Sequence, residues 1–321
     1  MSDLLEPPGR EETIPTPTYY GRPLLKMPHW DGWNVVTYLF LGGVMGGLGV
    51  IGVLADPKRE SDRKLKRTLA VTSLVLAAAN PSVLVTHLGR PERFLHMLRI
   101  VKIKSPMSMG VWGLVLYSGA AGMNVARELA QSGVLPRWLR FLAPPIFARL
   151  QAVVGAFLMG YTGVLLSATA NPLWSSGKRH IPVAFVCSSM SSACALASLL
   201  STVEGNSEVT HRLERLEMLA SAGELAALVS FERHAGDYGK ALFTGPAGDR
   251  LRTYTTQTGI LAPIALNLLG AIVPLPKPVD AVRTVIASVL TLIGGYNLRN
   301  TVVQAGRISV NDPSTAFVQP K

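Results

Sequence analysis

Eight apolar stretches separated by polar loops make up most of this chain of 321 residues. Each is long enough to cross a bilayer as a helix. They lie near residues 35–55, 68–87, 108–128, 145–169, 182–202, 214–233, 254–273 and 281–301. None alternates like a β-strand, and a membrane β-barrel needs shorter alternating segments. The pattern predicts an all-α fold, a polytopic membrane bundle of eight transmembrane helices.

The segments outside these stretches divide the chain into three parts. We expect an extended N-terminal arm over 1–33, a transmembrane domain over 34–305 and a C-terminal tail over 306–321. The arm is rich in proline and lacks the apolar core of a signal peptide. Proline favours extended backbone, so we expect the arm to lie along a surface or a partner protein.

Composition supports a membrane protein, because 48% of the residues are hydrophobic, 16% are charged and the mean hydropathy is +0.30. The net charge of +11 raises nucleic-acid binding as an alternative. That alternative fails because the basic residues lie in short loops between apolar stretches. Lys and Arg are divided almost evenly between the two sets of alternate loops, so the positive-inside rule leaves the orientation open.

Several common cofactors and catalytic motifs have no matching residues. Cys187 and Cys194 lie seven residues apart in one apolar stretch and form no CxxC pair, so we expect two core thiols, no iron–sulfur cluster and no metal site. The six histidines lie in loops or at the ends of stretches and supply no facing pair of axial ligands inside the bundle, so we expect no haem. A haem between His87 and another loop histidine is geometrically conceivable but poorly supported. Walker, dinucleotide-binding and HExxH motifs are absent from the sequence.

Glu224 is the polar residue that stands out, because it lies near the centre of the sixth stretch. A carboxylate at mid-bilayer costs about 2.5–3.5 kcal/mol on insertion scales. One interpretation is a catalytic role as a proton-carrying or quinone-linked carboxyl. The other is a structural pair with a basic residue such as Arg149. Both predict that Glu224 faces the interior of the bundle.

Three further polar residues are candidates for binding a ligand. Asn34 and Tyr38 are four residues apart at the start of the first stretch, so both can project from one helix face. This spacing suits a hydrogen-bonded ligand near the membrane surface, although Tyr38 also fits an interface anchor. Tyr161 lies deeper in the fourth stretch, where a buried core tyrosine is the commoner role.

The loop between the second and third stretches is unusually dense in charge. Gly89 and Pro91 predict a tight turn that presents Arg90, Glu92 and Arg93. These side chains can form charge-assisted hydrogen bonds with one another or with a docked subunit, and both interpretations stay open. With eight spans, this loop lies on the same side as the arm and the long sixth loop, which together would form a docking platform.

Four motifs resemble those of a known family: YLFLGG at 38–43, HLGRPERFLHML at 87–98, SPMSMGVW at 105–112 and YTGVLLSATANPLW at 161–174. With the eight stretches, they make the chain similar to the NrfD/PsrC family. Members of that family are integral-membrane, quinone-reactive subunits of iron–sulfur molybdoenzymes such as polysulfide reductase. LGRPERF followed by SPMS is the most specific part of the resemblance.

The resemblance implies two four-helix halves and a quinone, such as menaquinone, bound by Asn34, Tyr38 and Tyr161. Some relatives have a histidine where this chain has Tyr38, and a phenol is a poorer proton relay at neutral pH. The implied partners are a ferredoxin-like iron–sulfur subunit and a catalytic, molybdopterin-type subunit, which would carry the substrate-converting site. The implied location is the inner membrane of a prokaryote.

On this resemblance the chain would exchange electrons between membrane quinone and the docked ferredoxin-like subunit, with coupled proton movement as an option. Two alternatives stay open: a secondary transporter, which would also have many spans and an intramembrane carboxylate, and a structural anchor that binds no quinone. The terminal substrate and the direction of electron flow depend on other chains.

Overall fold

The computed structural model describes residues 32–56, 58–87, 96, 98–99, 101–131 and 145–310, and within these ranges it contains helices and no strand. The long helices are α1 (Trp33–Leu54), α2 (Glu60–His87), α4 (Pro106–Gln131), α5 (Ile146–Ser167), α7 (His180–Val203), α8 (Ser207–Ala235), α11 (Ala262–Ile272) and α12 (Lys277–Val310). The short elements are α6 (Pro172–Ser176), η2 (Gly236–Gly239), α9 (Lys240–Phe243) and α10 (Gly245–Arg250). A π-helical segment, η3 (Leu251–Leu261), runs directly into α11.

Each of the eight apolar stretches lies on one of these long helices or on the continuous η3–α11 segment, and several helices extend seven to nine residues beyond their stretch, so the predicted all-α fold is confirmed. Within the described residues, six helical segments are long and apolar enough to cross a membrane. They are α1, α2, α5, α7, the continuous segment Gly245–Ile272 and α12. Helices α4 and α8 have 26 and 29 residues but are less apolar, so the expected number of eight spans is not confirmed.

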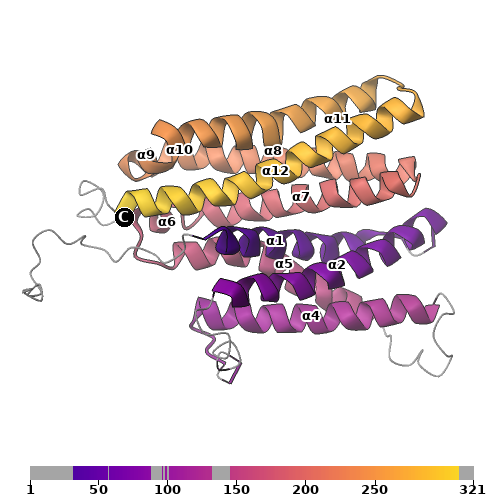
Figure 1. Ribbon diagram of the computed structural model, residues 1–321, viewed down its shortest axis with the longest axis horizontal. Coiled ribbons are helices and arrows are strands. Elements are labelled where there is room, and N and C mark those ends of the chain that lie inside the picture. The colour runs from indigo at the N-terminus through magenta and orange to yellow at the C-terminus, as the bar shows by residue number, and fades with distance from the viewer. Residues whose placement is uncertain are drawn as a thin grey trace, which may run out of the picture.

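The long helices lie roughly parallel and form two groups of four (Figure 1). Helices α1, α2, α4 and α5 pack together, and so do α7, α8, α12 and the continuous η3–α11 segment. The groups meet mainly where α1 contacts α7 and α12 and where α5 contacts α7. The interior between them is therefore lined by α1, α7 and α12.

Glycine permits the closest helix contacts in both groups, as small residues do in membrane bundles. A Cβ at Gly46 on α1 would lie 2.5 Å from the carbonyl oxygen of Gly155 on α5, and the reverse contact is equally short. A Cβ at Gly259 on η3 would lie 2.3 Å from the Cα of Gly294 on α12. Gly46 of the first stretch and Gly155 of the fourth therefore let α1 and α5 pack closely.

The NPLW part of the fourth motif joins the end of α5 to α12. Asn171 caps α6 by accepting a hydrogen bond from the backbone N–H of Trp174, and its Nδ2 donates to the carbonyl of Gly306 at 2.7 Å. The indole Nε1 of Trp174 donates to the carbonyl of Val302 at 2.9 Å. This short helix therefore holds the first group of helices to the last helix of the chain.

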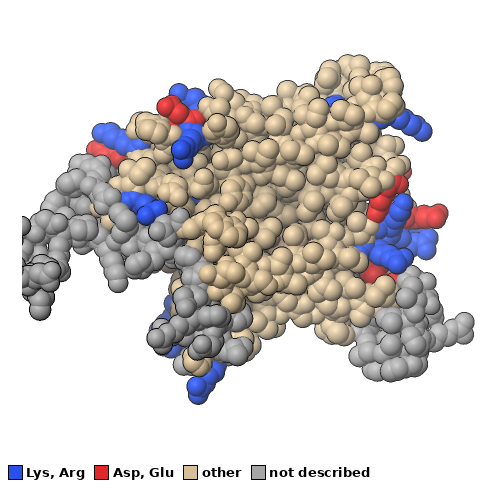
Figure 2. Space-filling model, in the orientation of Figure 1, with Lys and Arg blue, Asp and Glu red and all other residues tan. Residues whose placement is uncertain are grey.

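Charged side chains gather at the two ends of the helices, and the face shown in Figure 2 has a broad belt without them. The belt is what a bilayer core requires of a protein surface. The C-terminal end of α12 lies at the same end of the bundle as α6 and α9 (Figure 1). We refer to this as the α6 end; the turns α1–α2, α7–α8 and α11–α12 lie at the opposite end.

Candidate functional site

Tyr38 on α1 and Tyr161 on α5 lie near each other at the α6 end of the first group of helices. Their side chains are 8% and 5% exposed, and both belong to the main buried core of the bundle. Within the described residues neither hydroxyl makes a hydrogen bond, and neither oxygen is among the fully buried polar atoms that lack a partner. Both hydroxyls are therefore available to hydrogen-bond a molecule bound at this end. The burial of Tyr38 excludes an exposed interface anchor.

A glycine on α4 makes room for the phenol of Tyr161. A Cβ at Gly110 would lie 2.0 Å from the hydroxyl oxygen of Tyr161, so no other residue fits there without moving the ring. Phe157 supports the ring from one helical turn away, with ring centroids 5.5 Å apart. Gly110 belongs to the SPMSMGVW motif and Tyr161 opens the YTGVLLS motif. The two motifs therefore meet at one phenol.

Asn34 lies one helical turn before Tyr38 on α1, half-exposed at the end of the helix. Its Nδ2 donates to Oγ1 of Thr86 on α2 at 3.1 Å. The bond fixes the amide while leaving its carbonyl oxygen and second N–H available to a ligand. The three predicted binding residues are therefore at one end of the same group of helices.

Glu224 on α8 faces the interior, as predicted, and is 3% exposed. The hydroxyl of Ser191 on α7 donates to its Oε2 at 3.4 Å. Its basic neighbour is Arg299 on α12, a fully buried residue whose charge acts on the carboxyl. Arg149, the partner we had suggested, lines a separate cavity between α1, α2, α4 and α5 instead.

Arg299 connects the carboxyl region to α1. Its Nη1 and Nη2 donate to the hydroxyls of Ser188 and Ser189 on α7 at 3.2 and 2.7 Å, and its Nε donates to the carbonyl of Leu39 at 3.2 Å. Leu39 is the neighbour of Tyr38 in the chain. Polar groups on α7 and Arg299 therefore connect the region of Glu224 to the backbone of α1 beside Tyr38.

A column of buried polar residues follows one face of α8 away from Glu224. Thr210, Glu214, Glu217, Ser221 and Glu224 recur every three or four residues, and all are buried. Glu214 and Glu224 are ten residues apart, or about 15 Å along the helix. We call these five residues the α8 column; it leads from the opposite end of the bundle toward its middle.

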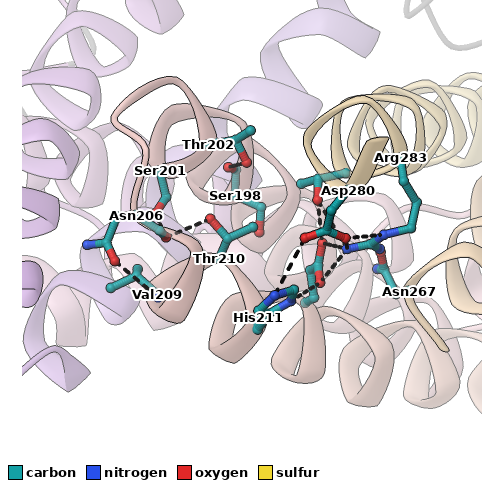
Figure 3. A network of polar contacts seen from close by, with 12 residues as sticks. Ser198, Ser201, Thr202, Asn206, Val209, Thr210, His211, Asn267, Asp280 and Arg283 are labelled. Atoms are coloured by element: carbon teal, nitrogen blue, oxygen red, sulfur yellow. Dashed lines mark hydrogen bonds and ion pairs between the residues drawn. The ribbon is translucent and has the colours of Figure 1, made fainter. Parts of the chain in front are cut away.

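The outer end of the α8 column is an ion-pair cluster between α8, α11 and α12. Figure 3 shows His211, Asp280, Arg283 and Asn267 turned toward one another there. Arg283 Nη2 donates to both carboxyl oxygens of Glu214, at 2.8 and 3.0 Å, and Nδ1 of His211 lies 3.1 Å from Glu214 Oε2. The buried charges are thus paired, as burial demands.

Further in, the column continues through hydroxyl groups and carboxyls. Thr291 Oγ1 on α12 donates to Glu217 Oε1 at 2.6 Å, and Asn267 and Arg283 are the other polar neighbours of that carboxyl. A cavity of about 320 Å³ opens beside the outer cluster and is lined in part by Thr210, Asp280 and Thr284. Thr284 also donates to Glu214 at 2.8 Å. Thr210, the first member of the α8 column, therefore lies at the wall of an open cavity.

Sequence reasoning selected Glu224 but missed Arg299, Arg283, Glu214 and Glu217. Glu224 lies near the centre of its stretch, whereas these four residues lie close to the ends of theirs, where a charge is ordinary. Their pairing depends on contacts between helices far apart in the chain. The docking residues Arg90, Glu92 and Arg93, and nearly all of the N-terminal arm, lie outside the described residues.

Comparison with known proteins agrees with the motifs. The family model described as "Polysulphide reductase, NrfD" matches residues 24–311. The chain is 29% identical over 319 residues to Protein NrfD of Escherichia coli (strain K12), an alignment that covers 88% of this chain and 96% of that relative. The match to the family model extends from before α1 to the end of α12. The chain is therefore a membrane protein that belongs to the polysulphide reductase NrfD family.

Proposed function

We propose that this protein is the quinone-reactive membrane subunit of an iron–sulfur oxidoreductase complex. The observation that carries the proposal is the pair of buried phenols, Tyr38 and Tyr161, whose hydroxyls have no hydrogen-bond partner among the described residues. The family resemblance implies a quinone at these positions. A quinone carries two carbonyl oxygens that accept hydrogen bonds, so the donors present fit it.

In this proposal the protein binds and orients the quinone, while the quinone itself carries two electrons and two protons when bound. Asn34 and Tyr38 hydrogen-bond one oxygen of the head group, and Tyr161 contacts the ring from α5. Arg299 places a fixed positive charge behind Tyr38 through the Leu39 carbonyl. Eight spans and two four-helix halves complete the proposed architecture, with α4 and α8 crossing the bilayer inside the bundle.

The phenols are tested by replacing Tyr38 and Tyr161 with phenylalanine, singly and together, in the intact complex in native membranes. We expect Tyr38→Phe to lower quinol-linked turnover by about tenfold, since one lost hydrogen bond to a ligand costs about 1–1.5 kcal/mol. Tyr161→Phe keeps the ring contact and should lower turnover less. Assembly should be unchanged. A double variant that turns over at the wild-type rate would make the protein an anchor without a quinone site.

Gly110 gives an independent test that leaves both phenols in place. Gly110→Ala should displace the Tyr161 ring and raise the apparent KM for quinol. Gly119→Ala, on the same helix, is the matched control, because a Cβ there meets nothing within 4 Å. Equal kinetics in the two variants would contradict a site at Tyr161.

We also propose that the α8 column delivers protons to Glu224 from the end opposite the tyrosine site. Carboxyl and hydroxyl groups in series relay protons, and the column ends near the groups that reach Tyr38. Glu224→Gln and Glu217→Gln should slow turnover and abolish any dependence of turnover on membrane potential. Glu232→Gln on the exposed face of α8 is the control. Turnover unaffected by either column variant would leave Glu224 a structural partner of Arg299.

We propose that the ferredoxin-like subunit docks at the α6 end, against the arm and the loop carrying Arg90, Glu92 and Arg93. The tyrosine site lies at this end, which shortens the path for electrons. Arg90→Glu with Arg93→Glu should abolish co-purification of an iron–sulfur protein from native membranes, whereas Arg63→Glu at the opposite end should not. A protein that purifies alone and catalyses solute flux would instead be a transporter.

A further inference from the structure

A second cavity lies between α1, α2, α4 and α5 at the end of the bundle opposite the tyrosine site. Its volume is about 260 Å³. Its polar lining residues are Lys66, Ser73, Asn124, Arg127, Glu128, Arg149 and Gln151. The remaining lining is mostly apolar, with Leu48, Val53 and Leu69 among its members. The cavity has no part in the quinone site or the α8 column.

Its charge is strongly unbalanced. Lys66, Arg127 and Arg149 line it, and Glu128 is the single carboxylate in the lining. Lys66 has both Glu128 and Arg127 as electrostatic neighbours. No ion pair within the described part of the chain uses any of the three cations, and the buried Nε of Arg127 has no hydrogen-bond partner there. Three cations beside one carboxylate give the cavity a net positive lining, which favours an anionic ligand.

The inner wall of the cavity is held rigid by a chain of hydrogen bonds. Asn124 Nδ2 donates to Gln151 Oε1 at 2.9 Å, and Gln151 Nε2 donates to the hydroxyl of Tyr117 at 3.2 Å. That hydroxyl donates in turn to the carbonyl of Met45 on α1. Three helices are thus tied together behind the cavity, so the cations surround a fixed space.

The position and the lining together specify the ligand. The cavity lies where α1 and α4 end and α2 and α5 begin, with apolar side chains beside the cations. Helix ends are the part of a membrane bundle that meets lipid head groups. A phosphate meets the cations, and acyl chains meet the apolar wall. Basic pockets between transmembrane helices bind anionic lipid head groups in this way. We propose that this cavity binds the phosphoryl head group of an anionic phospholipid.

The test uses the full chain purified from native membranes in mild detergent. Native mass spectrometry should show a retained anionic phospholipid, and added phosphatidylglycerol should raise the Tm, whereas phosphatidylcholine should not. Inorganic phosphate at the same concentration should have no effect. Stabilisation by phosphate alone equal to that by phosphatidylglycerol would overturn the lipid assignment and leave a free-anion site.

Arg127→Gln with Arg149→Gln should weaken phosphatidylglycerol binding by about 30-fold, because each basic residue near a membrane surface contributes about a fivefold factor. The matched control is Arg63→Gln with Arg215→Gln, two exposed cations at the same end. The single Arg149→Gln variant changes an exposed side chain and keeps the test valid if the double variant misfolds. Lipid retention equal to the control in both variants would overturn the proposal.

Discussion

At the scale of single residues, Arg299 determines how the interior is organised. Its fully buried guanidinium donates to three helices, α1, α7 and its own α12, through Leu39, Ser188, Ser189 and Gly295. The rings of Phe40 and Phe185 lie 5.5 and 5.1 Å from its Cζ. A cation over aromatic faces is stabilised by their quadrupoles. The residue therefore combines a charge for Glu224 with the packing of a large side chain.

We expect Arg299→Met to lower the free energy of unfolding by about 3–5 kcal/mol, the cost of leaving one partner of a buried pair without the other. The apparent Tm in detergent measures this. Adding Glu224→Gln should recover part of the loss, because the carboxylate no longer needs a partner. Arg233→Met, at an exposed position on α8, is the control. Losses that simply add in the double variant would show that the two residues are not coupled.

The sequence was sufficient to find Glu224 and to place it in the interior. It was insufficient to identify its partner, because Arg299 is 75 positions later and the pairing requires α7, α8 and α12 to be assembled. The tyrosine site was reached through motif resemblance together with helical spacing. Neither the resemblance nor the spacing identified the role of Gly110. The space that this glycine leaves for Tyr161 exists only between packed helices.

At the scale of elements, close helix packing rests on a few glycines. Gly46→Val should force α1 and α5 apart, because a Cβ there meets the carbonyl oxygen of Gly155 at 2.5 Å. We expect the Tm and the yield of folded protein to fall, as overpacking costs about 1–3 kcal/mol. Gly52→Ala, on the same helix with nothing within 4 Å, should be neutral or slightly stabilising. Similar losses of Tm in both variants would show that the substitutions act through the helix propensity of α1 rather than through packing against α5.

The helices themselves were the most predictable elements. Apolar stretches of about 20 residues have few alternatives in a bilayer, where backbone groups must be satisfied internally. The apolar pattern does not predict the π-helix over residues 251–261. Such segments depend on the packing of neighbours, here the contact of Gly259 with Gly294, rather than on local propensity.

At the scale of the whole molecule, α4 and α8 decide the topology. If all eight helices cross the membrane, single cysteines at Lys178 and Lys240 react with an impermeant maleimide from one side, and those at Arg63 and Lys277 react from the other. Each single cysteine is introduced into a protein that carries Cys187→Ala and Cys194→Ala, so that it is the only thiol able to react. Lys178 and Lys240 flank the α7–α8 hairpin, so labelling from opposite sides would mean that α8 does not cross.

The bond from Arg299 to Leu39 joins residues 260 positions apart. During synthesis the first helix enters the membrane long before the last one leaves the ribosome. Until then the serines of α7 and the carboxyl of Glu224 have no cation, and the unfinished protein carries this polar surface in lipid. Completion of the chain is thus itself the step that seals the interior, and a nascent or truncated protein lacking α12 is left recognisable to membrane quality-control proteases.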